Sequence, residues 1–232
     1  MKNLSRSHLL FALVALLAGG CATSSFGHRS ENCDPDQRLE QLLDAYESGR
    51  NGGINSSGNL LADCQRARNA IERLALEFPA HAPTLLAAGQ LAYENGEREK
   101  AQNYVDQIFR LQPIYPAAGV LRAQIATDEG NVPLARRVLE TQIQYTPDHA
   151  LLRESHAKVL FLSGDLSGAA SAVDAAEALG APAWRVAFHR GLIAEKAGRA
   201  AEARAQYQAC IDANPSYAAA KSRLSGMNAQ GG

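Results

Sequence analysis

The chain has 232 residues, of which 46% are hydrophobic and 20% charged, and its formal net charge is −1. These values are ordinary for a folded protein of one or two domains. The lysines and arginines form no cluster along the chain, which argues against a nucleic-acid-binding protein because affinity for phosphates depends on clustered basic residues.

The first twenty residues have the organisation of a secretory signal peptide. Two basic residues, Lys2 and Arg6, precede an unbroken apolar run over 9–18, which is too short for a stable membrane span. The run ends in Leu-Ala-Gly-Gly-Cys at 17–21, which resembles a bacterial lipobox. That resemblance implies cleavage after residue 20 and acylation of Cys21. The alternative is an ordinary signal peptide in which Cys21 falls by chance.

The residues after Cys21 indicate where such an anchor would hold the protein. Ala22, not aspartate, follows the cysteine. By resemblance to lipoproteins of Gram-negative bacteria, this implies the outer membrane, with the chain facing the periplasm. The polar residues of 21–35 are typical of a flexible tether.

Residues 36–81 are predicted to contain N-terminal helices and a degenerate repeat. A helix over 36–48 precedes a loop over 49–59, whose glycine content is unfavourable for helix. Cys33 and Cys64 bracket this region, and an oxidising compartment would permit a disulfide between them, the alternative being two unpaired thiols.

Residues 82–217 repeat with a period of 34. Glycines recur at this spacing, an alanine lies five residues after each, and a glycine or alanine lies seven residues before each. Each glycine is expected in a turn between two helices, since it adopts positive φ without a Cβ penalty. Prolines follow at 113, 147, 182 and 215 and favour the end of each second helix. The glycines are Gly96, Gly130, Gly164 and Gly198, the alanines are Ala101, Ala135, Ala169 and Ala203, and the small residues before them are Gly89, Ala123, Ala157 and Gly191.

This pattern resembles the tetratricopeptide repeat family. The resemblance implies an all-α solenoid of antiparallel helix pairs: four repeats over 82–115, 116–149, 150–183 and 184–217, with a capping helix and tail over 218–232. Cys210 falls at a small, buried repeat position and is expected to be a core thiol. The chain departs from the family pattern in two respects. The large aromatic that is common early in each first helix is replaced by Leu85, Gly119, Arg153 and Ala187, and Gln142 stands where a small residue is usual.

The resemblance also implies a partner-binding groove along the first helix of each repeat. Its expected surface is mixed, with apolar anchors, two side-chain amides and a few charges. Only Lys158 fits the cationic positions that some members use to hold a C-terminal carboxylate. The groove positions are Leu86, Gln90, Tyr93, Val120, Gln124, Thr127, Glu154, Lys158, Phe161, Arg185, Phe188, Leu192 and Glu195.

No pattern in the sequence predicts catalysis. The six histidines do not pair with Cys, Asp or Glu at metal-ligand spacing, and the glycines are accounted for as turn residues instead of a phosphate-binding loop. We therefore expect no enzyme activity, no metal, no cofactor and no small-molecule substrate.

The expected function is that of a periplasmic scaffold that binds other proteins. The arrangement resembles tetratricopeptide lipoproteins that assist assembly of envelope complexes, in particular pilotin-like proteins of type IV or Tad-type pilus and secretin systems. The alternative is an adaptor or regulator of cell-wall or polysaccharide enzymes.

Overall fold

The computed structural model describes residues 34–50 and 60–230, with the side chains of 60–63 and 230 left aside. Within these ranges the chain forms eleven α-helices and no strand, which confirms the all-α prediction. None of the described helices is long and apolar enough to cross a membrane. The predicted signal peptide, Cys21 and the tether up to Cys33 lie outside the described residues.

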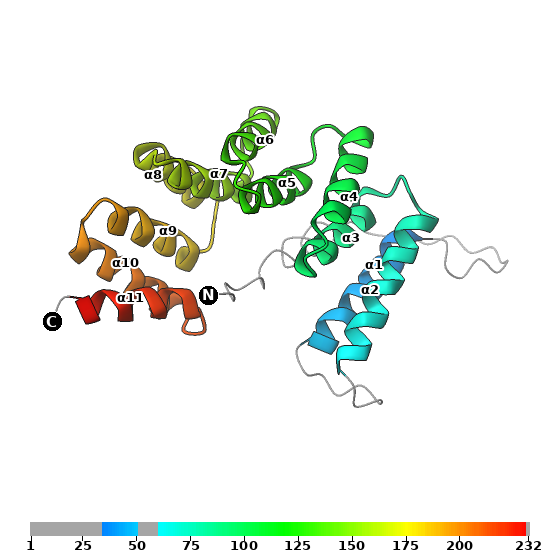
Figure 1. The fold of residues 1–232 in the computed structure, drawn as a ribbon, viewed down its shortest axis with the longest axis horizontal. Coiled ribbons are helices and arrows are strands. Elements are labelled where there is room, and N and C mark those ends of the chain that lie inside the picture. Colours follow the sequence, from blue (N-terminus) through cyan, green and yellow to red (C-terminus); the bar gives the residue numbers. More distant parts are fainter. Residues whose placement is uncertain (1–33, 51–59, 231–232) are drawn as a thin grey trace, which may run out of the picture. The chain divides into compact units, whose positions relative to one another are not determined.

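The chain divides between Pro113 and Ile114 into two compact units (Figure 1). The first contains two antiparallel helix pairs, α1 (Pro35–Arg50) with α2 (Leu60–Glu77) and α3 (Ala82–Glu94) with α4 (Arg98–Leu111). Helix α1 extends two residues beyond the predicted C-terminal boundary at residue 48, and Gly49 is a buried helical residue.

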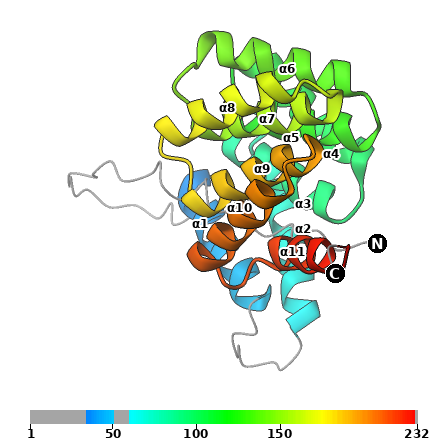
Figure 2. The same ribbon diagram turned by 90° about the vertical axis from the view of Figure 1, so that its left-hand side faces the viewer.

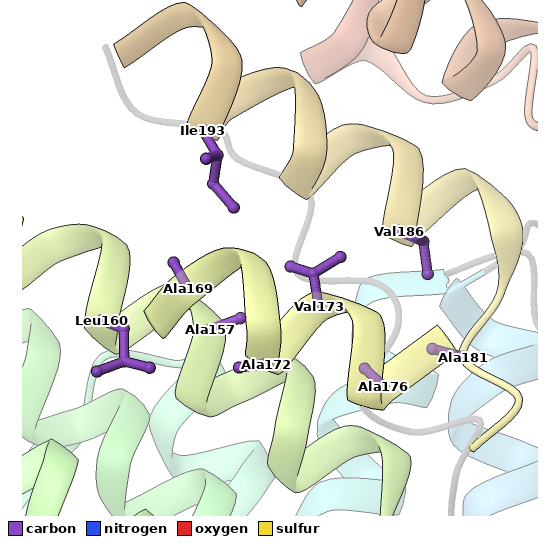
Figure 3. Close-up of a cluster of buried hydrophobic side chains, with 9 residues drawn as sticks. All are labelled: Ala157, Leu160, Ala169, Ala172, Val173, Ala176, Ala181, Val186 and Ile193. Atoms are coloured by element: carbon purple, nitrogen blue, oxygen red, sulfur yellow. The ribbon is translucent and has the colours of Figure 1, made fainter. Parts of the chain in front are cut away.

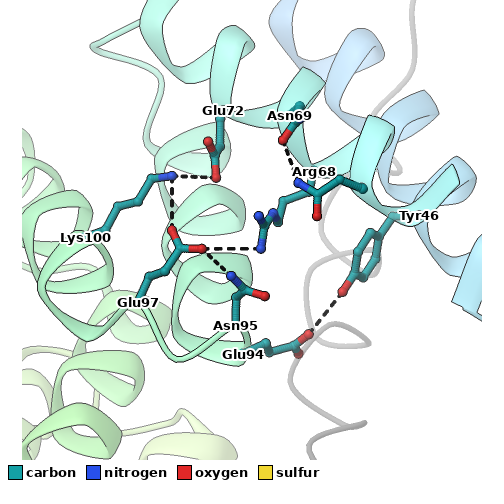
Figure 4. A network of polar contacts seen from close by, with 9 residues as sticks. Tyr46, Arg68, Asn69, Glu72, Glu94, Asn95, Glu97 and Lys100 are labelled. Atoms are coloured by element: carbon teal, nitrogen blue, oxygen red, sulfur yellow. Dashed lines mark hydrogen bonds and ion pairs between the residues drawn. The ribbon is translucent and has the colours of Figure 1, made fainter. Parts of the chain in front are cut away.

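A network of ion pairs joins the two pairs of the first unit (Figure 4). The Lys100 Nζ lies 2.6 Å from Glu72 Oε1 on α2 and 3.3 Å from Glu97 Oε2, just before α4. Arg68 of α2 also reaches Glu97, and the Tyr46 hydroxyl donates to Glu94 Oε2 over 3.4 Å. These contacts fix α1 and α2 against the turn between α3 and α4.

The second unit contains three further helix pairs and a last helix (Figure 2). The first helix of each pair packs against the second, and α11 packs against α10. The helices are α5 (Pro116–Asp128), α6 (Val132–Tyr145), α7 (Ala150–Ser163), α8 (Leu166–Ala178), α9 (Ala183–Lys196), α10 (Ala200–Ala213) and α11 (Ala218–Gln230).

The turns between paired helices confirm the role of the repeated glycines. All four have positive φ, from 75° to 87°, as does Gly180 in the connection from α8 to α9, which the period did not predict. Residues with a Cβ rarely adopt this conformation, so glycine lets each first helix end sharply.

Small residues form much of the core between helices. In one cluster, Ala157 of α7 meets Ala169, Ala172 and Val173 of α8, and Val186 and Ile193 of α9 cover them (Figure 3). The short side chains let the helices approach closely, as the repeated alanines predicted.

The departures at Gly119 and Gln142 compensate for each other. Gln142 of α6 is buried, and its Cγ lies 2.5 Å from the point where a Cβ on residue 119 would stand. Its Oε1 accepts from the backbone N–H of Tyr115 over 2.8 Å. The large side chain therefore comes from the second helix of this repeat instead of the first.

The C-terminal end of the second unit is closed by aromatic packing. The rings of Trp184 and Tyr217 lie 4.8 Å apart, and Phe188 packs on Tyr217 and Tyr207. Cys210 is fully buried in this cluster, which confirms the predicted core thiol. Cys64 lies in α2 with its Sγ 3.7 Å from the Tyr46 carbonyl oxygen, while Cys33 is outside the described residues, so the disulfide stays a prediction.

Candidate protein-binding site

The predicted binding residues of the second unit lie on α5, α7 and α9, the first helices of their pairs, and we call this the inner-helix face. Val120 and Phe188 are buried, with 5% and 8% of their surface exposed, and act as core residues. The others are half-buried. They are Gln124, Thr127, Glu154, Lys158, Phe161, Arg185, Leu192 and Glu195.

Lys158 and Gln124 join two neighbouring helices of this face. The Lys158 Nζ donates to Gln124 Oε1 over 3.0 Å, from α7 to α5. Burial lowers the pKa of Lys158 because the charged form loses hydration, and Asp128 opposes that shift only in part. Gln124 is therefore already engaged by a side chain of its own protein.

Glu154 connects α7 to α9. Its Oε2 lies 3.2 Å from the Arg185 Nε, and its Oε1 lies 3.3 Å from the His189 Nε2. Only 12% of the Glu154 side chain is exposed, so water screens these contacts less than it screens a surface pair. One carboxylate thus holds both of these α9 side chains.

Phe161 and Lys196 form a third contact between α7 and α9. The Lys196 Nζ lies 5.1 Å from the centroid of the Phe161 ring, a cation–π arrangement. Beside Phe161, Leu162 keeps 44% of its surface exposed. This part of the face presents apolar surface next to positive charge.

Glu195 is engaged at the end of the unit. It accepts a hydrogen bond from the Tyr207 hydroxyl and lies 3.2 Å from the Arg223 Nη1 of α11. Burial and this carboxylate raise the pKa of Tyr207, so the phenol stays protonated and keeps donating. Thr127 donates to the Ala123 carbonyl oxygen within α5.

The predicted residues of the first repeat lie in the core of the first unit. Leu86, Gln90 and Tyr93 on α3 expose 1%, 3% and 8% of their surface. Helix α3 is mostly apolar, is buried on nearly all sides and contacts α1, α2 and α4. These three side chains are thus placed differently from those of the inner-helix face.

In the part of the chain that the structure describes, the arrangement closest to a catalytic triad is a set of side-chain contacts at the start of α3. The His81 Nε2 lies 3.0 Å from Asp36 Oδ1, and its Nδ1 lies 2.6 Å from the Thr84 Oγ1. Thr84 is fully buried in the first turn of α3, so a substrate could not approach its hydroxyl. Among the described residues, no three His, Cys, Asp or Glu side chains are grouped to hold a metal ion.

Three residues of this face were absent from the sequence-based prediction: Leu162, His189 and Lys196. Each lies one position after a predicted residue on the same helix, namely Phe161, Phe188 and Glu195. The prediction took single positions from the family pattern. Including the neighbouring residues on the same side of each first helix would have added these three.

Comparison with known proteins agrees with this architecture. Among solved structures, similar ones include a tetratricopeptide repeat protein of Thermus thermophilus (TM-score 0.67, 18% identity, 84% of this chain and 98% of that one). Another is a tetratricopeptide repeat protein of Parabacteroides merdae (TM-score 0.62, 19% identity, 83% and 80% covered). A third is PilW, described as a widely conserved type IV pilus biogenesis factor (TM-score 0.64, 11% identity, 78% of each chain). At these identities the likeness shows the fold alone.

A family model assigns the repeats directly from the sequence. The tetratricopeptide repeat model matches residues 86–148 and 154–218, which together make up more than half of the chain. No curated protein matches the sequence. The matches follow the 34-residue period of the glycines and the helix pairs of the structure. The chain belongs to the tetratricopeptide repeat family.

Proposed function

We propose that this protein is a scaffold anchored by lipid to the periplasmic side of the outer membrane, where it binds other proteins and assists assembly of an envelope complex. Tetratricopeptide repeats serve protein–protein interaction, and the half-buried polar and apolar side chains of the inner-helix face suit that role. The observation that carries the proposal is the combination of this array with the Leu-Ala-Gly-Gly-Cys sequence at 17–21.

The envelope complex that we propose is a type IV or Tad-type pilus, with its secretin as the partner. The support is the similarity in fold and coverage to PilW, a type IV pilus biogenesis factor. A lipid anchor would hold the scaffold at the membrane into which a secretin inserts. Acyl chains contribute about 0.8 kcal/mol per buried methylene, so two or three chains retain a protein at a bilayer.

The test is crosslinking in intact cells of the source bacterium, followed by affinity capture of the full chain and mass spectrometry. Recovery of a secretin or another pilus component supports the proposal. Recovery of cell-wall or polysaccharide enzymes without pilus components replaces it with the adaptor function.

The anchor is tested separately with the variant Cys21→Ala. The proposal expects the wild-type chain in the outer-membrane fraction and the variant released from it, with loss of acyl mass at the N-terminus. A Cys210→Ala variant is the matched control, because that thiol is buried in the repeat core. Equal membrane retention of wild type and Cys21→Ala would refute the lipid anchor.

A further inference from the structure

Lys158 carries a charge that its surroundings only partly satisfy. Its ammonium group has three N–H donors, and among the described residues it makes one hydrogen bond, to the neutral amide of Gln124. Asp128 attracts it at longer range. A half-buried ammonium with one neutral acceptor costs folding free energy, and a carboxylate would offset that cost.

Lys196 is the second cation of this region. Its ammonium stands over the Phe161 ring, and no carboxylate lies within 4.0 Å of it among the described residues. The ring attracts the charge without neutralising it. Lys158 and Phe161 are three residues apart on α7, which places them on neighbouring turns of the same helix face.

Two of the nearby carboxylates are engaged elsewhere, and a third, Asp128, acts on Lys158 only at longer range. Glu154 holds Arg185 and His189, while Glu195 holds Tyr207 and Arg223. Asp128 offsets part of the charge of Lys158, and Lys196 has no carboxylate partner among the described residues, so the two lysines give this part of the inner-helix face an excess of positive charge. That charge contrasts with the formal net charge of −1 for the whole chain.

Apolar surface lies beside the two lysines. Phe161 and Leu192 are half-buried, and Leu162 exposes 44% of its surface. Each lysine can hold a separate carboxylate, while an apolar side chain packs against the surface around Phe161. A nucleic acid would require an extended array of cations, which this patch of two does not provide.

We infer that this face of α7 and α9, around Lys158, Phe161 and Lys196, binds an acidic segment of a partner protein in which carboxylates flank an apolar side chain. The inference rests on the proposed protein-binding function and specifies the chemistry of its ligand. Binding would supply the acceptors that Lys158 and Lys196 lack within the described part of the chain.

The inference is tested with three labelled peptides and the full-length chain in detergent. The first is a twelve-residue peptide with Asp and Glu on both sides of a central Phe-Leu. The second replaces the acids by Asn and Gln, and the third replaces Phe-Leu by Ser-Ser. Fluorescence anisotropy should show the first binding at least about tenfold more tightly than either of the others, and more weakly at higher salt.

Charge variants identify the binding residues. Lys158→Met and Lys196→Met keep most of the apolar stem and remove the charge, and each should weaken binding of the acidic peptide about fivefold or more. Lys158→Arg should retain most of the affinity. The matched control is Lys221→Met, an exposed lysine of α11 that should bind as the wild type does.

Three results would overturn the inference: none of the peptides binds, the amide peptide binds as tightly as the acidic one, or both methionine variants bind as the wild type does.

Crosslinking in cells with the double variant Lys158→Met and Lys196→Met separates this inference from the proposed function. Partner capture at the wild-type yield keeps the scaffold and rejects the acidic-segment site. Acidic-peptide binding without capture of any envelope component keeps the site and rejects the pilus role.

Discussion

At the scale of single residues, the contact between Gly119 and Gln142 shows how one repeat departs from the family pattern and still fills its core. Glycine costs about 1 kcal/mol relative to alanine within a helix, so its place in α5 needs a reason. The reason is the close approach of the Gln142 Cγ. The side chain cannot withdraw freely, because its amide oxygen holds the Tyr115 N–H.

The substitution Gly119→Ala should therefore have opposite effects in two backgrounds. In the wild type, overpacking should outweigh the gain in helix propensity and destabilise the protein by about 1–2 kcal/mol. In a Gln142→Ala background the space is open, and the same change should stabilise by a few tenths of a kcal/mol to about 1 kcal/mol. Urea denaturation of the four proteins measures both effects. The same sign in both backgrounds would contradict the compensation.

His156 gives a prediction about pH. Burial, together with Arg136 and Arg153, lowers the pKa of this imidazole, and Glu140, with its Oε1 3.7 Å away, opposes the shift in part. The unfolded chain therefore takes up the proton at a higher pH than the folded one. Stability should fall as pH drops through about 6.5 towards the folded-state pKa.

The variant His156→Asn should lose less stability between pH 7 and pH 5 than the wild type does, as measured by denaturation at each pH. Equal pH dependence of the wild type and His156→Asn would show that another group is responsible.

At the scale of helices, the second helices of the repeats begin with unequal caps. Asn131 accepts from the Leu134 N–H at the start of α6, and Asp165 accepts from the Gly168 N–H at the start of α8. Arg199 occupies the same position before α10 and makes no side-chain cap. Its positive charge also lies at the positive end of the helix dipole.

Arg199→Ser should stabilise α10 by about 0.5–1 kcal/mol, because the sequence Ser-Ala-Ala-Glu over 199–202 would form a capping box. Asp165→Ala should destabilise α8 by about 1 kcal/mol. Amide hydrogen exchange in the first turn of each helix measures these effects locally. Faster exchange in α10 of Arg199→Ser would contradict the capping argument.

The helices themselves could be predicted from the sequence because their signals are local. Gly96, Gly130, Gly164 and Gly198 mark turns by backbone conformation alone, and the period places every other boundary relative to them. Gly180 and the ends of α1 were missed because they lie outside the period. Gln142 could be recognised as unusual, but its contact with Gly119 depends on how two helices approach.

At the scale of the whole molecule, the candidate site was less predictable than the fold. The 34-residue period identifies the helices that form the inner-helix face. The exposure of each side chain on that face depends instead on its contacts with side chains of the neighbouring helices. Lys158 with Gln124, and Glu154 with Arg185, are contacts between residues about one repeat apart. Leu86 is buried on α3, a helix that contacts α1, α2 and α4, and no single repeat contains all of these helices.

Helix α11 packs against α10 and covers the apolar side of the α9–α10 pair, which would otherwise be open to water. Ala220 is fully buried against α9 and α10, Leu224 and Met227 pack beside it, and Arg204 donates to the Met227 carbonyl oxygen over 3.1 Å. Cys210 lies in the same cluster, where burial raises its thiol pKa to about 11. Its reactivity therefore reports whether the cap is in place, since the thiolate is the reactive form.

Ending the chain after Tyr217 should raise the alkylation rate of Cys210 by iodoacetamide at least about tenfold, as burial and the raised pKa are both relieved. Mass spectrometry of the peptide containing Cys210 distinguishes it from Cys64. Lys221→Ala, on the exposed side of α11, should leave the alkylation rate of Cys210 unchanged.

In the shortened chain, amide hydrogen exchange should rise more in α9 and α10 than in α5 and α6, because each repeat contacts mainly its neighbours. An unchanged Cys210 rate in the shortened chain would mean that the last pair is stable without a cap.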